Sequence, residues 1–564
     1  MTLVSGSKLL VDSLRGLGVQ HIFALLGSDL VPVFDILRET PEISLVNVRH
    51  EQAAGHMADG YARVSLKAGV CMVHNGPGLT NVITGIAAAY RAFSPVVLIS
   101  GAPTTRELYR DTIQELNQTA LTRPIVKWNA TITRVERIPE MVRRAFSIAL
   151  QGRKGPVHLD IPRDMLLDFC DVSNAAVSPN NYDVVDFPRV SPDSDIIVQA
   201  ARLLLSASNP LIIAGGGVKW SEATKEVIAL AEMLTAPIAT SYGHIDAVPG
   251  DFPLFIGQLG RDGSETAKRI AKEADVILAV GTRLGAFTTF FSQDCFSRDV
   301  KIIQVDIEPS EIGRHYRVAL GMVGDAKAVL RALIEAVKNV SSGVLVKNTD
   351  RLNKIVAMRR EEKDKLALTA SSDATPIKPQ RVFRELREAL KRDAIIVLDD
   401  GNAVAFGYKL LEFYEPRTFL SPLDLACVGC GYPTALGAKI AKPDKQVAAV
   451  CGDGGFIMTL HEIATAVQHG INVAAVVLNN NCWAAEKAYQ KHFYGGRYFG
   501  CDLLNPCFAE VAEKFGAFGV RVERPGELRE ALTQALDAEK PSVVEVLVDP
   551  EELNPPARGD LMKR

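Results

Sequence analysis

The chain has 564 residues, of which 47% are hydrophobic and 23% are charged, and its formal net charge is −3. These are the proportions of an ordinary globular protein, and the small net charge excludes nucleic acid and anionic membranes as expected partners. The N-terminal residues lack the basic-then-apolar layout of a signal peptide, and no uncharged apolar run approaches the ~20 residues that span a bilayer. Nine cysteines scattered through so long a chain are typical of a reducing compartment, so we expect a cytoplasmic protein.

Alternating helical and strand patterns predict a first α/β domain over residues 1–170. Apolar residues recur at helical spacing over 8–17, and short apolar runs bounded by turn residues predict strands. The polar, proline-punctuated stretch 171–192 that follows is typical of a linker. The expected strands are 22–26, 69–73, 95–100 and 155–162.

The same alternation predicts a central domain over 190–345 and a C-terminal domain over 378–564. The charged residues 346–377 between them are expected to form a helical or extended linker. Strands that alternate with helices pair in parallel through right-handed crossovers, so the expected fold is α/β, with three doubly wound parallel-sheet domains. The further expected strands are 210–214, 237–240, 276–280, 301–305, 394–398, 447–450, 473–478 and 542–548.

A glycine-rich unit follows the expected strand 447–450 and precedes a helix that we expect to start at about Phe456. Its glycines let backbone N–H groups approach a diphosphate at a helix N-terminus, and Asp453 is a hard oxygen ligand suited to Mg²⁺. Taken alone, such a unit is more often a turn. It consists of Gly452, Asp453, Gly454 and Gly455.

Two asparagines, Asn479 and Asn480, follow the next expected strand, 473–478. The side-chain oxygen of Asn480 is a second hard ligand. An Asn-Asn pair alone usually marks a loop, but both units stand at the carboxyl ends of expected parallel strands, where ligands bind in open α/β sheets. Together they predict a site for a metal ion and a diphosphate.

At this spacing the two units resemble the signature of thiamine diphosphate enzymes, and essentially the whole chain is similar to the acetolactate synthase-like superfamily. The resemblance implies that the first domain binds the pyrimidine ring of the cofactor and that the C-terminal domain binds its diphosphate. It implies thiamine diphosphate and Mg²⁺ as cofactors. It also implies an enzyme that makes or breaks a bond next to a carbonyl group through an enamine on the cofactor.

Glu51 opens an expected helix directly after an apolar strand. By itself it would be a charge favoured by the helix dipole. The resemblance implies instead a catalytic role, in which Glu51 hydrogen-bonds the aminopyrimidine ring and promotes the tautomer that removes the thiazolium proton. Gln114 resembles the glutamine that faces bound substrate. The other cofactor contacts implied in the first domain are Gly27, Gly76, Pro77, Gly78 and Asn81.

In the C-terminal domain, Val428 matches the apolar side chain that supports the bent cofactor, and its alternative is simple core packing. Cys482 matches the residue whose backbone carbonyl joins Asp453 and Asn480 as a metal ligand. Gly401 and Asn402 match a second diphosphate loop. With the glycine-rich unit, the implied cofactor contacts here are Gly401, Asn402, Val428, Gly452, Asp453, Gly454, Gly455, Asn480 and Trp483.

Cys427 and Cys430 form a C-x-x-C pair. A zinc ribbon needs a second pair at similar spacing, and Cys501 with Cys507 is too wide. A redox dithiol is the remaining functional alternative. We interpret the two cysteines as small residues in a tight glycine-rich segment.

The central domain carries three consecutive glycines, 215–217, after an expected strand. They do not form G-x-G-x-x-G, and glycine-rich strand ends also occur without ligands. In relatives this domain holds FAD, ADP or nothing, and the sequence leaves these three alternatives open.

Two segments of the sequence narrow the range of expected substrates. Residues 25–28 depart from the glycine-rich loop usual in acetolactate synthases, and residues 483–490 (Trp-x-Ala-Glu-Lys-x-x-Gln) are similar to sulfoacetaldehyde acetyltransferases. Cys427, Ala484 and His74 differ from that pattern. The expected reaction converts sulfoacetaldehyde and phosphate into acetyl phosphate and sulfite.

The alternative from the same superfamily is an acetolactate synthase-like decarboxylase and carboligase that acts on pyruvate, and Gln114 is compatible with it. A third alternative is a non-catalytic cofactor sensor, which would not need the proton relay of Glu51. Lys487, Arg497 and Arg558 are candidate cations for a sulfonate or phosphate, or else charges on a solvated face.

The two halves of the cofactor site lie on the first and third domains, and the resemblance implies that they come from different chains. We therefore expect a homodimer at minimum and a homotetramer built from two dimers. The expected partner is otherwise a small-molecule substrate, a 2-oxo acid or an aldehyde.

Overall fold

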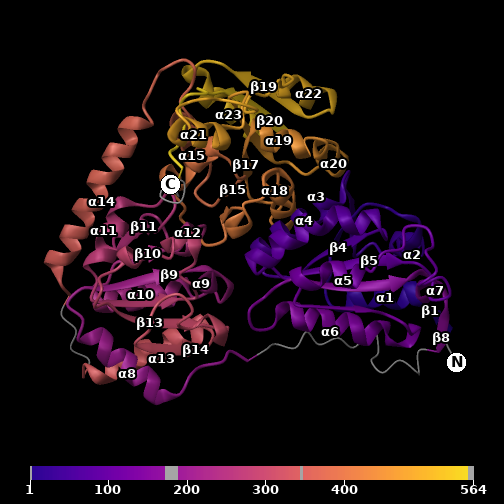
Figure 1. Ribbon diagram of the computed structural model, residues 1–564, viewed down its shortest axis with the longest axis horizontal. Helices are drawn as coiled ribbons and strands as arrows, with labels where there is room; N and C mark the ends of the chain where they lie inside the picture. The colour runs from indigo at the N-terminus through magenta and orange to yellow at the C-terminus, as the bar shows by residue number, and fades with distance from the viewer. Residues whose placement is uncertain (1–2, 172–187, 343–346, 557–564) are drawn as a thin grey trace.

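The computed structural model describes residues 3–171, 188–342 and 347–556. Three six-stranded sheets with helices packed around them build the molecule (Figure 1). Neighbouring strands run parallel within each of these sheets, because each crossover between strands carries a helix or a long loop. The expected α/β fold with three doubly wound parallel sheets is confirmed.

The first sheet has the strand order β3-β2-β4-β5-β7-β6. The order reverses between β2 and β4, and the loops after these two strands carry Gly27 and Gly76. Such a switch point leaves a crevice at the carboxyl ends of the strands, where ligands bind. The strands are β2 (His21–Ala24), β3 (Ser44–Asn47), β4 (Gly69–Val73), β5 (Val96–Ala102), β6 (Trp128–Thr131) and β7 (Val157–Pro162).

The C-terminal sheet repeats this topology with the order β16-β15-β17-β18-β20-β19. Its switch point lies between β15 and β17, whose following loops carry Gly401 and Asp453. The two crevices that the sequence analysis singled out are therefore equivalent positions of two domains with one topology. The strands are β15 (Ile395–Leu398), β16 (Phe419–Leu420), β17 (Val447–Gly452), β18 (Ala474–Asn479), β19 (Phe518–Val522) and β20 (Ser542–Leu547).

The central sheet has a different order, β11-β10-β9-β12-β13-β14, and switches between β9 and β12. The loops at this switch point carry the glycine run 215–217 and Gly281. The strands are β9 (Pro210–Ala214), β10 (Ile238–Thr240), β11 (Phe255–Gln258), β12 (Val276–Val280), β13 (Lys301–Asp306) and β14 (Leu320–Val323).

Helix α3 (Glu51–Ser65) of the first domain packs against α18 (Gly431–Ala441) of the C-terminal domain. A Cβ atom on Gly60 would lie 2.1 Å from the Thr434 carbonyl oxygen, and one on Gly437 would lie 2.0 Å from the Met57 carbonyl oxygen. Glycine at both positions lets the two backbones touch. The apolar residues around this crossing form one core that includes residues of both domains.

The segment between the central and C-terminal domains is the helix α14 (Thr349–Thr369), which runs along the outer edge of the molecule in Figure 1. This agrees with the expected helical or extended linker at 346–377. Most of the other expected linker, residues 172–187, lies outside the described residues.

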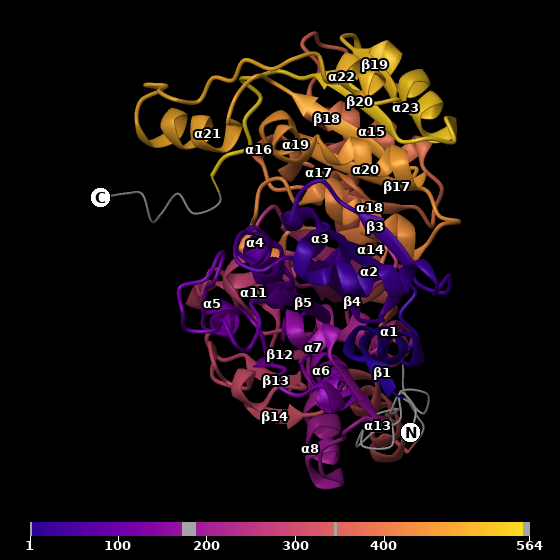
Figure 2. The same ribbon diagram turned by 90° about the vertical axis from the view of Figure 1, so that its right-hand side faces the viewer.

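The expected helix after the glycine-rich unit starts earlier than predicted: α19 spans Asp453–Thr459, so the unit itself forms the first turn. Gly452 is the extended residue before the helix, and an acidic residue in the first turn is favoured by the helix dipole. Helix α21 (Ala484–Phe493) projects from the C-terminal domain (Figure 2). No helix among the described residues is long and apolar enough to cross a membrane.

Candidate active site

Three loops meet at one edge of the C-terminal sheet. β15, β17 and β18 are neighbours that run in the same direction. Gly401 follows β15, Asp453 follows β17 and Asn480 follows β18. The structure therefore brings together the two sequence units that predicted a metal-diphosphate site.

Three polar groups converge beside the start of α19. In one orientation of the Asn480 amide, its nitrogen lies 3.3 Å from Asp453 Oδ1 and 3.1 Å from the Cys482 carbonyl oxygen. In the other orientation, three oxygen atoms face one another without a hydrogen between them. A cation would satisfy this second arrangement, because carboxylate, amide and carbonyl oxygens are ligands that Mg²⁺ takes in proteins. The three residues predicted to bind metal fit the ion.

Asn505 holds the Asp453 carboxylate from the other side. Its Nδ2 atom donates to Asp453 Oδ2 at 2.7 Å and to Asn479 Oδ1 at 3.1 Å. Asp453 is only 2% exposed, and burial raises its pKa to about 6. A buried carboxylate without a cationic partner favours a nearby positive charge. Asn505 was missed from the sequence, because it stands in an irregular segment without a motif.

The two glycines at the start of α19 permit close packing. A Cβ atom on Gly454 would lie 2.5 Å from the Trp483 ring, and one on Gly455 would lie 2.5 Å from Asp399 Oδ2 and 3.3 Å from Val428 Cγ1. Val428 and Trp483 therefore both pack against the glycine-rich unit. Asp399 lies behind it, fully buried, and burial raises its pKa to about 7.

The side chain of Asn402 is engaged by the C-terminal tail. Its Nδ2 atom donates to the Asn554 carbonyl at 2.7 Å, and its Oδ1 atom accepts from the Asn554 N–H at 2.8 Å. Gly401, directly before it, has φ +155°, outside the range of most other residues. The backbone of this turn, rather than the Asn402 side chain, is the candidate for contact with a diphosphate.

In the first domain, Glu51 is the first residue of α3, and its side chain is buried. Glu51 Oε2 accepts a hydrogen bond from Asn81 Nδ2 at 2.9 Å. A Cβ atom on Gly78 would lie 3.4 Å from Glu51 Oε1. Three of the predicted cofactor contacts thus meet at the start of α3 and α4 (Pro77–Ala92).

Glu462, on α20 (Glu462–His469), holds the chain that enters α3. Its fully buried carboxylate accepts from the N–H groups of Arg49 and His50, both at 3.0 Å, and from Thr465 Oγ at 2.5 Å. Burial raises its pKa to about 7. Because α20 belongs to the C-terminal domain, this carboxylate positions Glu51 from across the domain boundary.

Gly76 and Gln114 lie against each other. Gly76 has φ +57°, and a Cβ atom on it would lie 2.5 Å from the Gln114 carbonyl oxygen. Gln114 has φ +61°, which is uncommon for a residue with a side chain, and its Oε1 atom lies 2.7 Å from His74 Nε2. The predicted substrate-facing glutamine is therefore held beside the predicted aminopyrimidine loop.

Gln118, at the start of α5 (Gln118–Thr122), connects this loop to a buried network. Its Oε1 atom accepts from the Gly76 N–H at 2.9 Å, and its Nε2 atom donates to Asp160 Oδ1 at 2.6 Å. Ser100 Oγ donates to the same Asp160 oxygen at 2.7 Å. Burial raises the pKa of Asp160 to about 6. The sequence gives no local signal for this network, since its members come from β5, α5 and β7.

Gly27 lies close to His74: a Cβ atom on it would lie 2.4 Å from the His74 Cβ atom. Asp29 Oδ2 lies 3.2 Å from His74 Nδ1. Burial raises the pKa of Asp29, and the His74 charge opposes this shift. His74 thus stands between Asp29 and Gln114, at the switch point of the first sheet.

The described residues form two half-sites. One surrounds Glu51 and Gly76 in the first domain, and the other surrounds Asp453 and Asn480 in the C-terminal domain. Among the described residues, no hydrogen bond or ion pair joins these four residues across the two groups. One chain therefore carries both groups of residues, each on a different domain.

Lys487 and Arg497, two of the candidate cations for substrate, already have partners. Lys487 Nζ lies 2.7 Å from Glu551 Oε1 and 5.0 Å from the centre of the Tyr498 ring. Arg497 Nε donates to the Tyr494 carbonyl at 3.1 Å. The Lys487 charge is thus compensated within the protein. Arg558 lies outside the described residues.

A cavity of about 560 Å³ lies where the three domains meet. Gly216, Gly217 and Gly281 line it at the switch point of the central sheet. A Cβ atom on Gly217 would lie 2.6 Å from the Gly281 Cα atom, so these loops need glycine to approach each other.

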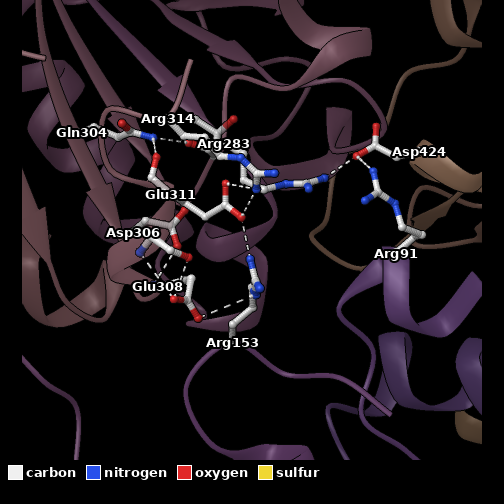
Figure 3. Close-up of polar contacts among 11 residues, drawn as sticks. Arg91, Arg153, Arg283, Gln304, Asp306, Glu308, Glu311, Arg314 and Asp424 are labelled. Carbon is white, nitrogen blue, oxygen red and sulfur yellow. Dashed lines mark hydrogen bonds and ion pairs between the residues drawn. The ribbon is translucent and has the colours of Figure 1, made fainter. Parts of the chain in front are cut away.

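Figure 3 shows the polar contacts of charged side chains that line this cavity, among them Arg91, Arg283 and Asp424. Asp424 of the C-terminal domain pairs with Arg283 of the central domain and, at 3.4 Å, with Arg91 of α4. Arg153 Nη1 lies 2.6 Å from Glu311 Oε1. All three domains thus contribute charged side chains to one cavity.

The chain matches three family models in succession. Residues 4–121 match "Thiamine pyrophosphate enzyme, N-terminal TPP binding domain", residues 197–333 match the central domain of that enzyme, and residues 399–546 match "Thiamine pyrophosphate enzyme, C-terminal TPP binding domain". Both half-sites fall within or directly beside the two matches described as binding the cofactor.

Similar proteins of nearly equal length carry two different names. The chain is 34% identical to a probable acetolactate synthase large subunit of Methanococcus aeolicus, over 97% of this chain and 92% of the relative. It is 34% identical to a sulfoacetaldehyde acetyltransferase of Castellaniella defragrans and 35% identical to one of Alcaligenes xylosoxydans xylosoxydans, each over 99% of this chain and 95% of the relative. These identities do not distinguish the two activities.

Proposed function

The chain belongs to the thiamine pyrophosphate enzyme family, in its acetolactate synthase-like branch, and from this membership we propose that it transfers the acetyl group of sulfoacetaldehyde to phosphate. The carbon–sulfur bond of the substrate breaks, the aldehyde carbon loses its hydrogen as a proton, and the carbon that carried sulfur gains a proton and becomes a methyl group. A bond from the resulting acetyl carbon to a phosphate oxygen forms, and the products are acetyl phosphate and sulfite. Two relatives named sulfoacetaldehyde acetyltransferase support the proposal.

Asp453, Asn480 and the Cys482 carbonyl would hold Mg²⁺, and the backbone around Gly401 and Gly454 would hold the diphosphate. Thiamine diphosphate, when bound, supplies the carbon that stabilises negative charge next to the substrate carbonyl. The cluster of three oxygen atoms that the Asn480 amide can complete supports this assignment, since nothing else among the described residues brings a positive charge to Asp453.

Glu51 would hold and move the proton at the aminopyrimidine side. Asn81 Nδ2 donates to Oε2, which leaves Oε1 as the atom that gives or takes a proton. The carboxyl group is buried, so water does not compete for that proton. Glu462 keeps the start of α3, and with it Glu51, in this position.

The contact between Trp483 and Gly454 supports this choice of substrate. The segment 483–490, which resembles sulfoacetaldehyde acetyltransferases, begins at this contact, beside the proposed cofactor site. His74, which differs from the acetyltransferase pattern, places a second polar group 2.7 Å from Gln114 Oε1. A sulfonate or phosphate anion needs such hydrogen-bond donors.

Product analysis tests this proposal. The purified protein, loaded with thiamine diphosphate and Mg²⁺, would receive sulfoacetaldehyde with phosphate in one reaction and pyruvate in another. We expect sulfite and acetyl phosphate from the first reaction and no carbon dioxide from the second. Consumption of pyruvate with release of carbon dioxide, and no sulfite from sulfoacetaldehyde, would overturn the proposal.

That opposite result is the signature of the second candidate function, a carboligase that decarboxylates pyruvate as acetolactate synthases do. Its support is the position of Gln114 against Gly76 and the relatives named acetolactate synthase. A second pyruvate as acceptor would then give acetolactate, which is distinguished from acetyl phosphate by mass spectrometry.

We propose an adenine nucleotide, FAD or ADP, as the ligand of the central cavity. Its volume of about 560 Å³ falls within the usual range of small-molecule sites. The close glycines let a phosphate approach the backbone. Extraction of the purified protein with acid, followed by absorbance and chromatography, would identify FAD or ADP. The cationic side chains that line the cavity are Arg91, Arg153, Lys154, Arg189 and Arg283.

The two unconnected half-sites support a homodimer in which each site combines the first domain of one chain with the C-terminal domain of the other, and two such dimers would form a tetramer. Sedimentation of the active protein tests this assembly, and an active monomer would contradict it. All nine cysteines are free thiols, which supports the cytoplasm as the compartment.

A further inference from the structure

Cys427 and Cys430 stand at the two ends of a tight turn formed by Val428 and Gly429. Gly429 has φ +87°, as the third position of a type II turn requires. The end residues of a β-turn have Cα atoms within ~7 Å of each other, and a disulfide spans such a separation. Both cysteines are free thiols, and Cys430 is the N-cap of α18.

Each thiol has its own partner. Cys427 Sγ lies 3.7 Å from His56 Nε2, and the Cys430 thiol donates to Asp399 Oδ1 at 3.7 Å. The neighbouring Cys430 thiol lowers the pKa of Cys427; burial opposes this shift, and the contact with His56 adds to it. The neighbouring Cys427, followed by burial, raises the pKa of Cys430. Cys427 is therefore the thiolate of the pair.

A small cavity adjoins Cys430 and His56. Its volume is about 10 Å³, room for about one water-sized molecule, and His56, Asp59 and Cys430 line it. The atoms His56 Nδ1 and Asp59 Oδ1 are buried and have no hydrogen-bond partner among the described residues. Buried polar atoms of this kind require a partner. A small molecule with O–H groups would supply it.

We propose that Cys427 and Cys430 are a redox dithiol that reacts with hydrogen peroxide to form a disulfide. The Cys427 thiolate attacks one peroxide oxygen, the O–O bond breaks, and the leaving hydroxide takes a proton from the His56 imidazolium. Cys430 then attacks the Cys427 sulfur, the new S–O bond breaks, and water leaves with the Cys430 proton. Two electrons pass from the dithiol to the peroxide, which becomes two water molecules.

This site differs from the proposed acetyl transfer, but it shares a residue with it. Val428 lies between the two cysteines, and it is the side chain expected to support the cofactor. Closure of the disulfide would reshape the turn that carries Val428. Bound thiamine diphosphate is therefore expected to slow the oxidation, an expectation that rests on the proposed function.

The test uses the full-length, freshly reduced protein and hydrogen peroxide. After treatment, free thiols are blocked under denaturing conditions and the protein is cut with trypsin. The peptide 418–439 contains Cys427, Cys430 and no other cysteine. We expect this peptide to lose the mass of two hydrogens, to escape the blocking reagent and to regain both thiols with dithiothreitol. Cys170, a half-buried thiol far from other cysteines in sequence, is the internal control. It should remain a free thiol after peroxide treatment and therefore react with the blocking reagent.

Two variants separate the steps. In Cys430→Ser, we expect the peroxide product to stop at a sulfenic acid on Cys427, which dimedone traps. In Cys427→Ser, we expect no reaction of the peptide, with circular dichroism as the check of folding. If peptide 418–439 keeps both thiols after peroxide treatment, or if Cys430→Ser gives no dimedone adduct, the proposal is wrong.

The pH dependence gives a further readout. His56 and Asp59 of α3, together with Asp399 and Asp400 after β15, face the two thiols. An ordinary thiol slows roughly tenfold for each pH unit below its pKa, because only the thiolate reacts. We expect Cys427 to keep its rate of reaction with peroxide between pH 8 and pH 6. A loss of rate as large as that of an ordinary thiol would contradict the thiolate assignment. The oxidation of the thiols is measured by the mass of the peptide and does not require the cofactor. Failure of the protein to bind thiamine diphosphate would therefore contradict only the proposed function.

Discussion

The backbone N–H of Gly76 donates to Gln118 Oε1 at 2.9 Å, and the other end of the same amide donates to Asp160 Oδ1 at 2.6 Å. One buried side chain thus joins the aminopyrimidine loop to a carboxylate of β7. Because an amide group has one acceptor end and one donor end, it serves both partners only in this orientation.

Replacement of Gln118 by Leu would leave the Gly76 N–H without its partner and would remove one of the hydrogen bonds to Asp160 Oδ1. Each unsatisfied buried group costs ~1–3 kcal/mol. We expect a lower thermal midpoint and weaker binding of thiamine diphosphate, measured by scanning fluorimetry and calorimetry. Gln534→Leu, at an exposed position of α23 (Leu528–Asp537), is the matched control. Cofactor affinity equal to that of the control would show that this amide does not position the loop.

Replacement of Glu51 by Gln keeps the size of the side chain and removes its titratable proton. Because general acid–base groups contribute roughly 10²–10⁴-fold to rates, turnover should fall by that order. Asn81 can still donate to the new amide oxygen, so the thermal midpoint should change little. Turnover with saturating cofactor is the measurement, and Glu42→Gln on the surface is the control. Full activity in Glu51→Gln would remove Glu51 from the catalytic residues.

Asp453→Asn removes the charged member of the proposed metal-ligand set. Without metal, we expect the variant to be at least as stable as the wild type at pH 8, because a carboxylate buried beside uncharged amides is unfavourable. In Asp453→Asn, the thermal midpoint should not rise when Mg²⁺ and thiamine diphosphate are added. We expect the same loss for the wild type when EDTA is present. Asp444→Asn, at an exposed position, should keep the gain. An undiminished gain in Asp453→Asn would place the metal elsewhere.

Glu462 should make stability depend on pH in a defined direction. Burial raises its pKa from an ordinary 4.5 to about 7 in the folded protein, so the folded state favours the protonated form. Its contribution is fully present below pH 4.5 and is lost as pH rises through 7. A shift of this size corresponds to about 3 kcal/mol.

Glu462→Gln does not titrate, while its amide oxygen can still accept from the Arg49 and His50 N–H groups. Relative to wild type, the variant should therefore gain stability as pH rises from 5 to 8. Thermal midpoints across this range are the measurement, and the exposed Glu527→Gln is the control. A constant difference between Glu462→Gln and wild type would refute the raised pKa.

Central strands could be predicted from the sequence, because strands buried on both faces are continuous apolar runs. The expected strands 69–73 and 276–280 coincide with β4 and β12. The edge strand β6 was missed, since it is half-exposed and mixes polar with apolar residues. Edge strands lack the pattern on which the prediction depends.

The residues of the candidate site also fall into a group that the sequence predicts and a group that it does not. Asp453 and Asn480 could be predicted, because a local motif at a strand end places each of them. Asn505, Gln118 and Glu462 could not, because they act through hydrogen bonds to residues far away in the chain. The start of α19 was predicted three residues too late (Phe456 against Asp453), since glycines were read as a loop and not as a first helical turn.

The glycine contact between α3 and α18 has a mechanical consequence. Glu51 begins α3, and Cys430 caps α18, so this crossing fixes one half-site of a chain against its other half-site. In the homodimer that we propose, those halves belong to two separate pockets. Each chain would then connect the two pockets rigidly. A displacement of residues at one pocket would therefore displace residues at the other.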